Sequence, residues 1–260
     1  MRRLLLALTT AGLVVAGCGQ SENDASPQNP TPTISEPTSP TPSQESSNTQ
    51  RPQDLWQESV AGTLSASAVD LEAQLITNVE GFERVVVGNG YVEMNQGFGD
   101  ITWTDDFGTS REVITDTGHF LELDDLWLEV APESPLPTTV AFTPLAGLAG
   151  ATNVVLSGSE EINGRPTMRL DADLDPGDGS SLMGFSEEER TVFAETSDAS
   201  LIATIWIDAD GQIVRVLREY RSSSQDADPI SATSLFLLTD LGQSRPLDFP
   251  ETSEAIPAPV

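Results

Sequence analysis

The sequence predicts an α+β domain that is mainly β, with an antiparallel sheet of about 10–11 strands and a few short helices. Two observations lead to this class. Apolar and polar residues alternate with a period of two over most of the chain after residue 62, which is the pattern of half-buried strands. The connections between these stretches are short and rich in Gly, Asn and Asp, which favours hairpins over the helical crossovers of a parallel sheet.

Residues 1–17 have the features of a secretory signal peptide. Met1-Arg2-Arg3 is basic, residues 4–15 form an apolar run too short to span a bilayer, and small residues follow. Cys18, the only cysteine of the chain, comes next, and this arrangement resembles the lipobox of bacterial lipoproteins. An ordinary secretory signal or a free core thiol would leave the position of Cys18 unexplained. The resemblance implies a diacylglyceryl cysteine at Cys18, with acyl chains such as palmitate anchoring the chain to the extracytoplasmic face of the cell membrane.

The charge of the chain narrows the classes of partner. Removal of Arg2 and Arg3 with the signal takes the formal net charge from −29 to −31, which disfavours binding to nucleic acid or to anionic lipid headgroups. All twelve basic residues are arginines, so Schiff-base lysines and phosphate-loop lysines are excluded. With one cysteine and one histidine, the chain lacks the residues for disulfides or for a multi-histidine metal site, and no cofactor or metal is expected.

Composition divides the mature chain into three parts. Residues 18–53 carry the lipidated cysteine and a tether rich in Pro, Ser and Thr, which we expect to be disordered. Residues 54–250 have the composition of one globular domain, and residues 251–260 form a tail.

Three segments of the domain are expected to be helical. Residues 54–61 place Leu55, Trp56 and Val60 on one apolar side, and residues 145–151 could form a turn or two. Residues 186–196 begin with Ser186 and Glu189 in a capping-box spacing, which predicts a helix.

The remaining stretches are expected to be strands. Gly88-Asn89-Gly90, Asn163-Gly164 and Ala209-Asp210-Gly211 are expected to be hairpin turns, because Gly and Asn tolerate positive φ. The predicted strands are 67–75, 82–87, 91–95, 101–104, 111–116, 119–123, 127–130, 154–158, 160–162, 167–174, 201–208, 212–221 and 230–240.

Three segments carry a resemblance to a known family. They are Asp125-Leu126-Trp127-Leu128, the segment at 158–164 (GSEEING) and the segment at 205–211 (IWIDADG). They resemble the LppX/LprG-type lipoproteins of actinobacteria and, more distantly, the LolA and LolB lipoprotein carriers. The resemblance implies a curved antiparallel sheet, or half-barrel, wrapped around a few helices, with an apolar cavity between sheet and helices that accepts acyl chains.

The resemblance and the alternation together suggest residues that line this cavity, although apolar stripes are more often part of a filled core. The candidate lining residues are Val69, Leu71, Ala73, Leu75, Val92, Met94, Trp103, Met168, Leu170, Ile205 and Ile207.

No set of residues supplies a nucleophile, a base and a partner for catalysis. No catalytic residue is therefore expected, and His119 is expected to be structural.

Two functions follow from these features. The first is a membrane-anchored, non-catalytic lipoprotein that binds or carries a lipid, a lipoglycan or the acyl chain of another lipoprotein. The alternative is an acidic, tethered module of the cell envelope with a packed core and no lipid cavity. The interior of the domain distinguishes them.

Overall fold

The computed structural model describes residues 51–66, 68–79, 81–94, 96–116, 118–123, 126–130, 144–177, 198–223, 230–245 and 255–257. These residues belong to one compact unit, Asn48–Val260. The predicted signal peptide, Cys18, nearly all of the predicted tether and the predicted helix at 186–196 lie outside the described residues. Within the described ranges, no helix is long and apolar enough to cross a membrane.

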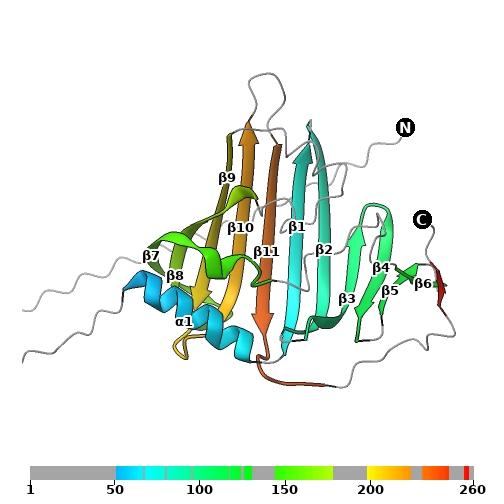
Figure 1. Cartoon of the computed structure of the whole chain (residues 1–260), viewed down its shortest axis with the longest axis horizontal. Helices are drawn as coiled ribbons and strands as arrows, with labels where there is room; N and C mark the ends of the chain where they lie inside the picture. The colour runs from blue at the N-terminus through cyan, green and yellow to red at the C-terminus, as the bar shows by residue number, and fades with distance from the viewer. Residues whose placement is uncertain are drawn as a thin grey trace, which may run out of the picture. The chain divides into compact units, whose positions relative to one another are not determined.

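Most of the described residues form a single sheet, against which one α-helix packs (Figure 1). The predicted mainly β, α+β class is therefore confirmed. The elements are α1 (Pro52–Ser65), β1 (Val69–Val79), β2 (Phe82–Glu93), β3 (Phe98–Asp105), β4 (Gly108–Ile114), β5 (His119–Leu123), β6 (Leu126–Glu129), the 3₁₀-helix η2 (Leu148–Gly150), β7 (Thr152–Ile162), β8 (Arg165–Leu174), β9 (Asp198–Ile207), β10 (Ile213–Ser223), β11 (Ile230–Thr239) and β12 (Ile256–Pro257).

The sheet consists of two antiparallel meanders that meet at its centre. Strands β1 to β6 are neighbours in chain order, as are β7 to β11, and β1 pairs with β11. At one edge β12 adds to β6 in parallel, so two residues of the predicted tail belong to the sheet. β7 forms the other edge, and the sheet is therefore an open one.

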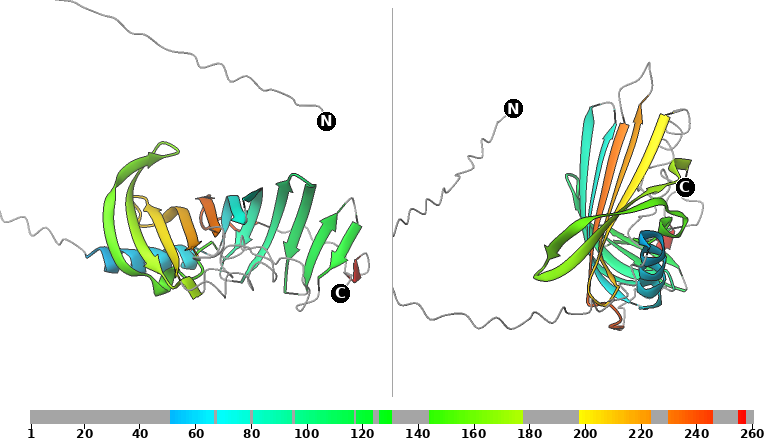
Figure 2. Two further views of the ribbon diagram at one scale, coloured as in Figure 1. Left: turned by 90° about the horizontal axis from the view of Figure 1, so that it is seen from above. Right: turned by 90° about the vertical axis from the view of Figure 1, so that its left-hand side faces the viewer.

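The sheet is curved most strongly at β7 and β8, whose hairpin curls away from the side that carries α1 (Figure 2). The pairing of β7 with β8 is interrupted by two register shifts, one between Thr152 and Val155 and one between Leu156 and Gly158. Such β-bulges bend a strand and increase its twist. The two bulges are therefore a physical cause of the curl. The curvature agrees with the curved sheet that the sequence resemblance implies.

One predicted turn is wrong. Residues 88–90 lie inside the continuous strand β2. Gly88 is needed because a Cβ there would lie 2.4 Å from the ring of Trp103, and Gly90 because a Cβ would lie 2.1 Å from the carbonyl oxygen of Asp100. These glycines allow close approach of β3 to β2, which is the other common reason for glycine in a strand.

The other two glycine turns are confirmed. Asn163 and Gly164 have φ of 51° and 77°, and Gly211 has φ of 80°, as tight hairpins require. The predicted strands at 154–158 and 160–162 form one bulged strand, β7, in which Gly158 has φ of 152°.

Cross-strand register identifies the buried face of the sheet, since directly paired residues share a face. Ala73 pairs with Phe236 on one side and with Gly88 on the other, and Gly88 pairs with Trp103. The apolar cluster of the core includes three of these residues and Trp56 of α1. We call this side of the sheet the helix face.

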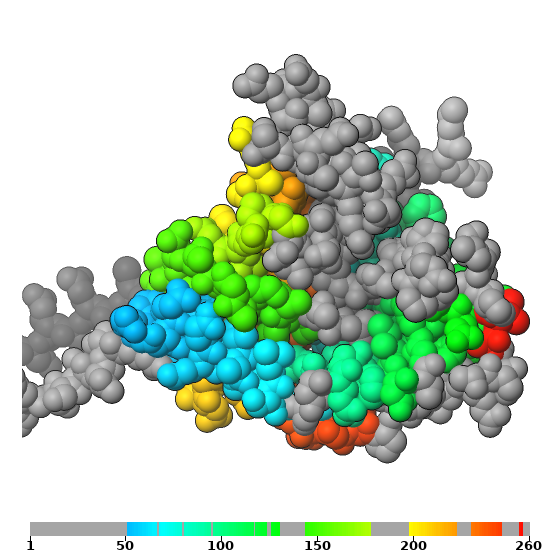
Figure 3. Space-filling model, viewed as in Figure 1, coloured from blue at the N-terminus to red at the C-terminus, as the bar shows by residue number. Residues whose placement is uncertain are grey.

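Helix α1 is held on the helix face by side-chain hydrogen bonds to η2. Trp56 is fully buried, and its Nε1 donates to the carbonyl oxygen of Leu148 over 2.7 Å. The amides of Gln53 and Gln57 donate to two further carbonyls of this turn over 3.2 and 3.0 Å. The spacing i, i+3, i+4 places these three donors on one side of the helix. Figure 3 shows α1 in blue beside the green residues that follow η2.

A buried arginine ties the segment before η2 to the sheet. Arg218 of β10 is fully buried on the helix face, where its cross-strand neighbours Ser234 and Ala203 are small enough to leave it space. Its Nη2 donates to the carbonyl oxygens of Pro144 and Ala146 over 2.6 and 2.8 Å. Burial lowers the pKa of Arg218 to about 10, so the guanidinium keeps its charge at neutral pH.

Candidate functional site: a pocket on strands β2 to β6

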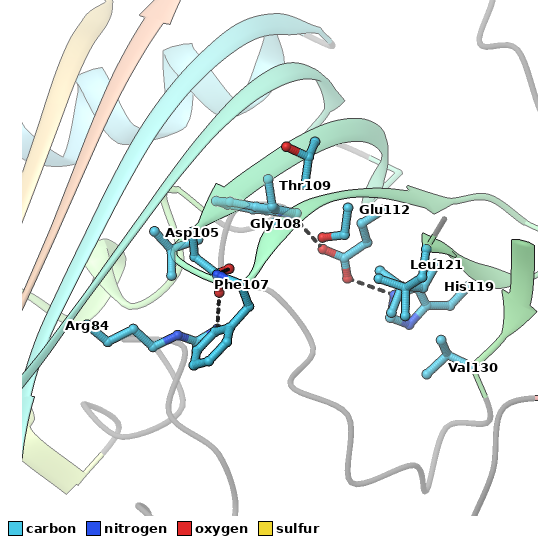
Figure 4. A pocket seen from close by; sticks show the side chains of 13 residues that line it. Arg84, Asp105, Phe107, Gly108, Thr109, Glu112, His119, Leu121 and Val130 are labelled. Carbon is cyan, nitrogen blue, oxygen red and sulfur yellow. Dashed lines mark hydrogen bonds and ion pairs between the residues drawn. The ribbon is translucent and has the colours of Figure 1, made fainter. Parts of the chain in front are cut away.

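A cavity of about 310 Å³ lies on the helix face at the half of the sheet formed by β2 to β6 (Figure 4). Register places it there, because Trp103 in its wall pairs with Gly88, which pairs with Ala73 of the core. The main contacts of α1 are with β7, β10 and η2, in the other half of the sheet. We call this cavity the β2–β6 pocket. It is lined by Arg84, Val86, Trp103, Asp105, Phe107, Gly108, Thr109, Ser110, Glu112, His119, Leu121, Leu123 and Val130.

The apolar part of the pocket comes from alternate residues of its strands. Val86, Leu121 and Leu123 are only partly buried or exposed, although they point to the same face as the buried core. Trp103 lies over Gly88 of the neighbouring strand, where no side chain blocks its ring. The pocket therefore continues the apolar core outward onto a surface with free apolar side chains.

A buried carboxylate forms the polar centre of the pocket. Glu112 is 2% exposed, and its two oxygens have separate partners. Nε1 of Trp103 donates to Oε2 over 3.0 Å, and Nε2 of His119 lies 2.7 Å from Oε1. In the tautomer that carries its hydrogen on Nε2, the imidazole donates to this carboxyl oxygen. The three side chains come from β3, β4 and β5, and each fixes the orientation of the next.

A second polar group lies at the β3–β4 end of the pocket. Arg84 donates to Asp105 over 3.1 Å, and the backbone N–H of Phe107 donates to the same carboxylate over 2.8 Å. The side chain of Arg84 is 41% exposed, and Phe107 is 86% exposed. A ligand end at this rim would meet a charged pair and an exposed aromatic ring.

Acid is expected to weaken the β3–β4 hairpin. Burial would raise the pKa of Asp105, but the N–H of Phe107 and the guanidinium of Arg84 outweigh it and lower the pKa. A carboxyl with a lowered pKa stabilises the fold above its unfolded value, about 3.9, and this contribution is lost as the pH falls through the lower folded value. Asp105→Asn should therefore reduce the loss of stability on acidification below about pH 4, as urea midpoints would show. Asp106→Asn, at the exposed neighbour, is the matched control, and equal slopes in the two variants would contradict this assignment.

The structure brings most of the predicted lining residues together, but in the core under α1. Val69, Leu71, Leu75, Val92, Leu170, Ile205 and Ile207 are buried in one cluster with Ala73 and Trp103, and Met94 packs against it. Met168 is 38% exposed. Trp103 also lines the β2–β6 pocket, and Ala73, whose side chain is on the helix face, borders a second cavity on the opposite face with its backbone. The role of the whole set as a cavity wall stays a prediction.

Sequence reasoning missed Glu112 and Arg84, and it treated His119 only as structural. Glu112 lies at an inward position of β4, between Ser110 and Ile114, where a carboxylate is unusual. That position was the one available signal. The partners of Glu112 could not be found from spacing, because Trp103 and His119 meet it through strand register.

Among the residues that the structure describes, no group of three or more His, Cys, Asp or Glu side chains could hold a metal ion. Asp171 and Asp173 lie on β8, and Asp171 accepts from Thr204 over 2.8 Å and from Arg169 over 3.1 Å. Burial would raise the pKa of Asp171, but these hydrogen bonds lower it.

Comparison with solved structures finds two mycobacterial lipoproteins and a lipoprotein-sorting protein domain, among others. LppX of Mycobacterium tuberculosis is 18% identical, with a TM-score of 0.48 over 74% of this chain and 98% of its own. LprF of Mycobacterium bovis is 13% identical, with a TM-score of 0.49 over 77% and 96%. A putative outer membrane lipoprotein-sorting protein domain from Vibrio parahaemolyticus is 10% identical, with a TM-score of 0.26 over 73% and 90%.

LppX-type lipoproteins, which the three sequence segments resemble, are thus among the solved structures that the chain matches. No protein-family model matches the chain, and comparison with curated proteins finds no match. At these identities the likeness concerns architecture alone. Function has to be inferred from the side chains of the β2–β6 pocket.

Proposed function

We propose that this protein is an extracytoplasmic lipoprotein that binds an amphiphile in the β2–β6 pocket without making or breaking a bond. The observation that supports this proposal is the composition of the pocket. Apolar side chains of β2, β3 and β5 surround a cavity of about 310 Å³, with the hydrogen-bonded pair of His119 and Glu112 at its centre and the ion pair of Arg84 and Asp105 at its rim. The volume lies near the lower end of the range of ligand pockets, about 300–1,000 Å³.

The two kinds of surface suit the two parts of an amphiphile. An acyl chain against Val86, Leu121 and Leu123 would remove apolar surface from water, at about 0.8 kcal/mol per buried methylene group. The hydroxyl or charged end of the ligand would face Arg84 and Asp105, which are already paired and partly exposed. Such a ligand leaves the buried hydrogen bonds of Glu112 intact.

A non-catalytic role agrees with the engagement of the single histidine. Nε2 of His119 is held by Glu112, and among the described residues no hydrogen bond joins His119 to a hydroxyl group. The hydroxyl of Thr109, another lining residue, is 3.2 Å from that of Thr104, its cross-strand partner. A nucleophile with an adjacent base, as covalent catalysis requires, is therefore not assembled by these residues.

Anchorage through Cys18 is part of this proposal. A lipidated Cys18 would hold the chain on the membrane, and the residues that follow it would give the domain reach. Cys18→Ser should move the protein from the membrane fraction to the soluble fraction. This full-length soluble variant also removes covalent acyl chains, which would complicate the detection of a bound lipid.

Ligand binding can be tested on the Cys18→Ser chain with a dansyl-labelled fatty acid and by native mass spectrometry. We expect saturable uptake of the probe and a lipid adduct at a stoichiometry near one. Val86→Trp, which fills the pocket, should weaken uptake by about tenfold or more, because the ring would occupy the space of the acyl chain.

Val85→Trp is the matched control for Val86→Trp. Val85 precedes Val86 on β2, points to the opposite face and is 36% exposed. This variant should bind the probe as the parent does. Equal losses in the two variants, or a clean apo mass with no probe uptake by the parent, would refute lipid binding in this pocket.

A further inference from the structure

A second cavity lies on the face of the sheet opposite α1. The tip of the β7–β8 hairpin projects on that side, as the right-hand view of Figure 2 shows. Between this tip and strands β1, β10 and β11 is a groove of about 420 Å³. We call it the hairpin groove. Because it lies on the other side of the sheet, it cannot be part of the β2–β6 pocket.

The floor of the groove is apolar although it faces outward. Leu235 and Leu237 of β11 line it, and they alternate with the buried Phe236 on the other side of the strand. Both leucines are only half-buried. Ile162, at the tip of the hairpin, lies across the groove from them and is also half-buried. Three partly exposed apolar side chains therefore converge where a one-sided sheet would carry polar residues.

Among the residues that the structure describes, the groove carries two carboxylates without ion-pair partners and one arginine that is already engaged. Glu72 on β1, which pairs with Leu237, and Glu161 on the hairpin both line the groove, and within the described residues neither carboxylate is in an ion pair. The cation of the groove, Arg215, is already engaged, because its guanidinium stacks 4.4 Å from the ring of Trp206 and lies 3.9 Å from Glu160. The free charge that an occupant would meet is negative.

We propose that the hairpin groove binds a segment of a partner protein in which apolar side chains alternate with arginine or lysine. The apolar residues would cover Leu235, Leu237 and Ile162, and the basic residues would lie between Glu72 and Glu161. A second copy of this chain is a poor occupant, since each mature chain carries a formal charge of about −31. An anionic lipid would be opposed by the same two carboxylates.

The proposal can be tested with synthetic peptides and the soluble Cys18→Ser chain. The probe is a seven-residue peptide, Ser-Arg-Leu-Arg-Leu-Arg-Ser, with blocked ends. Two comparison peptides replace its leucines by serine or its arginines by glutamate. We expect saturable binding of the first peptide alone, and a loss of about tenfold or more with Leu237→Ser.

Charge reversal distinguishes binding in the groove from nonspecific attraction of a basic peptide to this acidic protein. The double variant Glu72→Arg, Glu161→Arg should lose the arginine peptide by about tenfold and gain binding of the glutamate peptide. Glu83→Arg changes the charge of an exposed residue of β2 outside the groove, and it should alter affinity less than about twofold.

The proposal would be overturned by equal losses in Glu83→Arg and the double variant, by equal binding of the peptide without leucine, or by no saturable binding at all. Displacement of the dansyl fatty acid by the arginine peptide would also overturn it, because the two cavities lie on opposite faces. Failure of lipid uptake leaves these results unaffected, so the two proposals stand or fall separately.

Discussion

Replacing Gly90 by alanine is expected to destabilise the domain by about 3 kcal/mol or more. A Cβ at this position would lie 2.1 Å from the carbonyl oxygen of Asp100 and 2.7 Å from Cα of Ile101. Both atoms belong to the backbone of β3, which cannot rotate away as a side chain can. Relief would require β2 and β3 to separate, with loss of the hydrogen bonds around the Gly90–Ile101 pair.

Urea denaturation followed by tryptophan fluorescence measures this effect on the full-length soluble chain. Gly62→Ala is the matched control, because Gly62 lies in α1 and a Cβ there meets nothing within 4 Å. That change should stabilise the domain by about 1 kcal/mol through helix propensity. A Gly90→Ala protein as stable as its parent would show that β2 and β3 are not so close.

Trp56→Ala is expected to cost about 4 kcal/mol, the second large effect. The side chain is fully buried in the core cluster, and its Nε1 donates to the carbonyl oxygen of Leu148 over 2.7 Å. Alanine would leave a cavity, and the carbonyl oxygen of Leu148 would keep the N–H of Ala151 as its donor but lose that of the indole. Trp56→Phe keeps most of the ring volume and loses the hydrogen bond, so we expect a cost of about 1–2 kcal/mol.

The same denaturation assay orders these variants. Leu64→Ala provides the control on α1, since Leu64 is 40% exposed and its truncation should cost less than about 1 kcal/mol. If Trp56→Ala and Leu64→Ala were equally stable, α1 would not be held by Trp56. Such a result would contradict our interpretation of the helix face, in which the half covered by α1 stabilises the fold and the half on β2 to β6 binds a ligand.

The helix face therefore combines two environments. Under α1 and η2 the apolar residues are closed off by Trp56, the glutamine amides and the carbonyl groups that Arg218 holds. On β2 to β6 the same face presents partly exposed leucine and valine around Glu112. This division explains why most of the apolar residues selected from the sequence lie only in the core, whereas Trp103 belongs to the core cluster and also lines the pocket.

Short sequence patterns predicted the strands and turns well where the conformational preferences of neighbouring residues decide the structure. Residues 119–123 form β5 as predicted, and the Asn163-Gly164 turn requires only the φ preferences of two residues. Gly88-Asn89-Gly90 has the same local signature as a turn, but its glycines serve the close approach of Trp103 and of the β3 backbone. A distant strand decided the role of this segment, and local composition could not show it.

The mainly β class, most of the strands and the apolar alternation of the core can be predicted from the chain alone, because each depends on neighbouring residues and on a period of two. The residues that form sites, in contrast, are defined by contacts between strands. Glu112, Trp103 and His119 meet through the register of β3, β4 and β5. The hairpin groove exists because bulges curl β7 and β8 over β11. Strand register and sheet curvature arise from packing between strands that are distant in sequence. They therefore cannot be predicted from the spacing of residues along the chain.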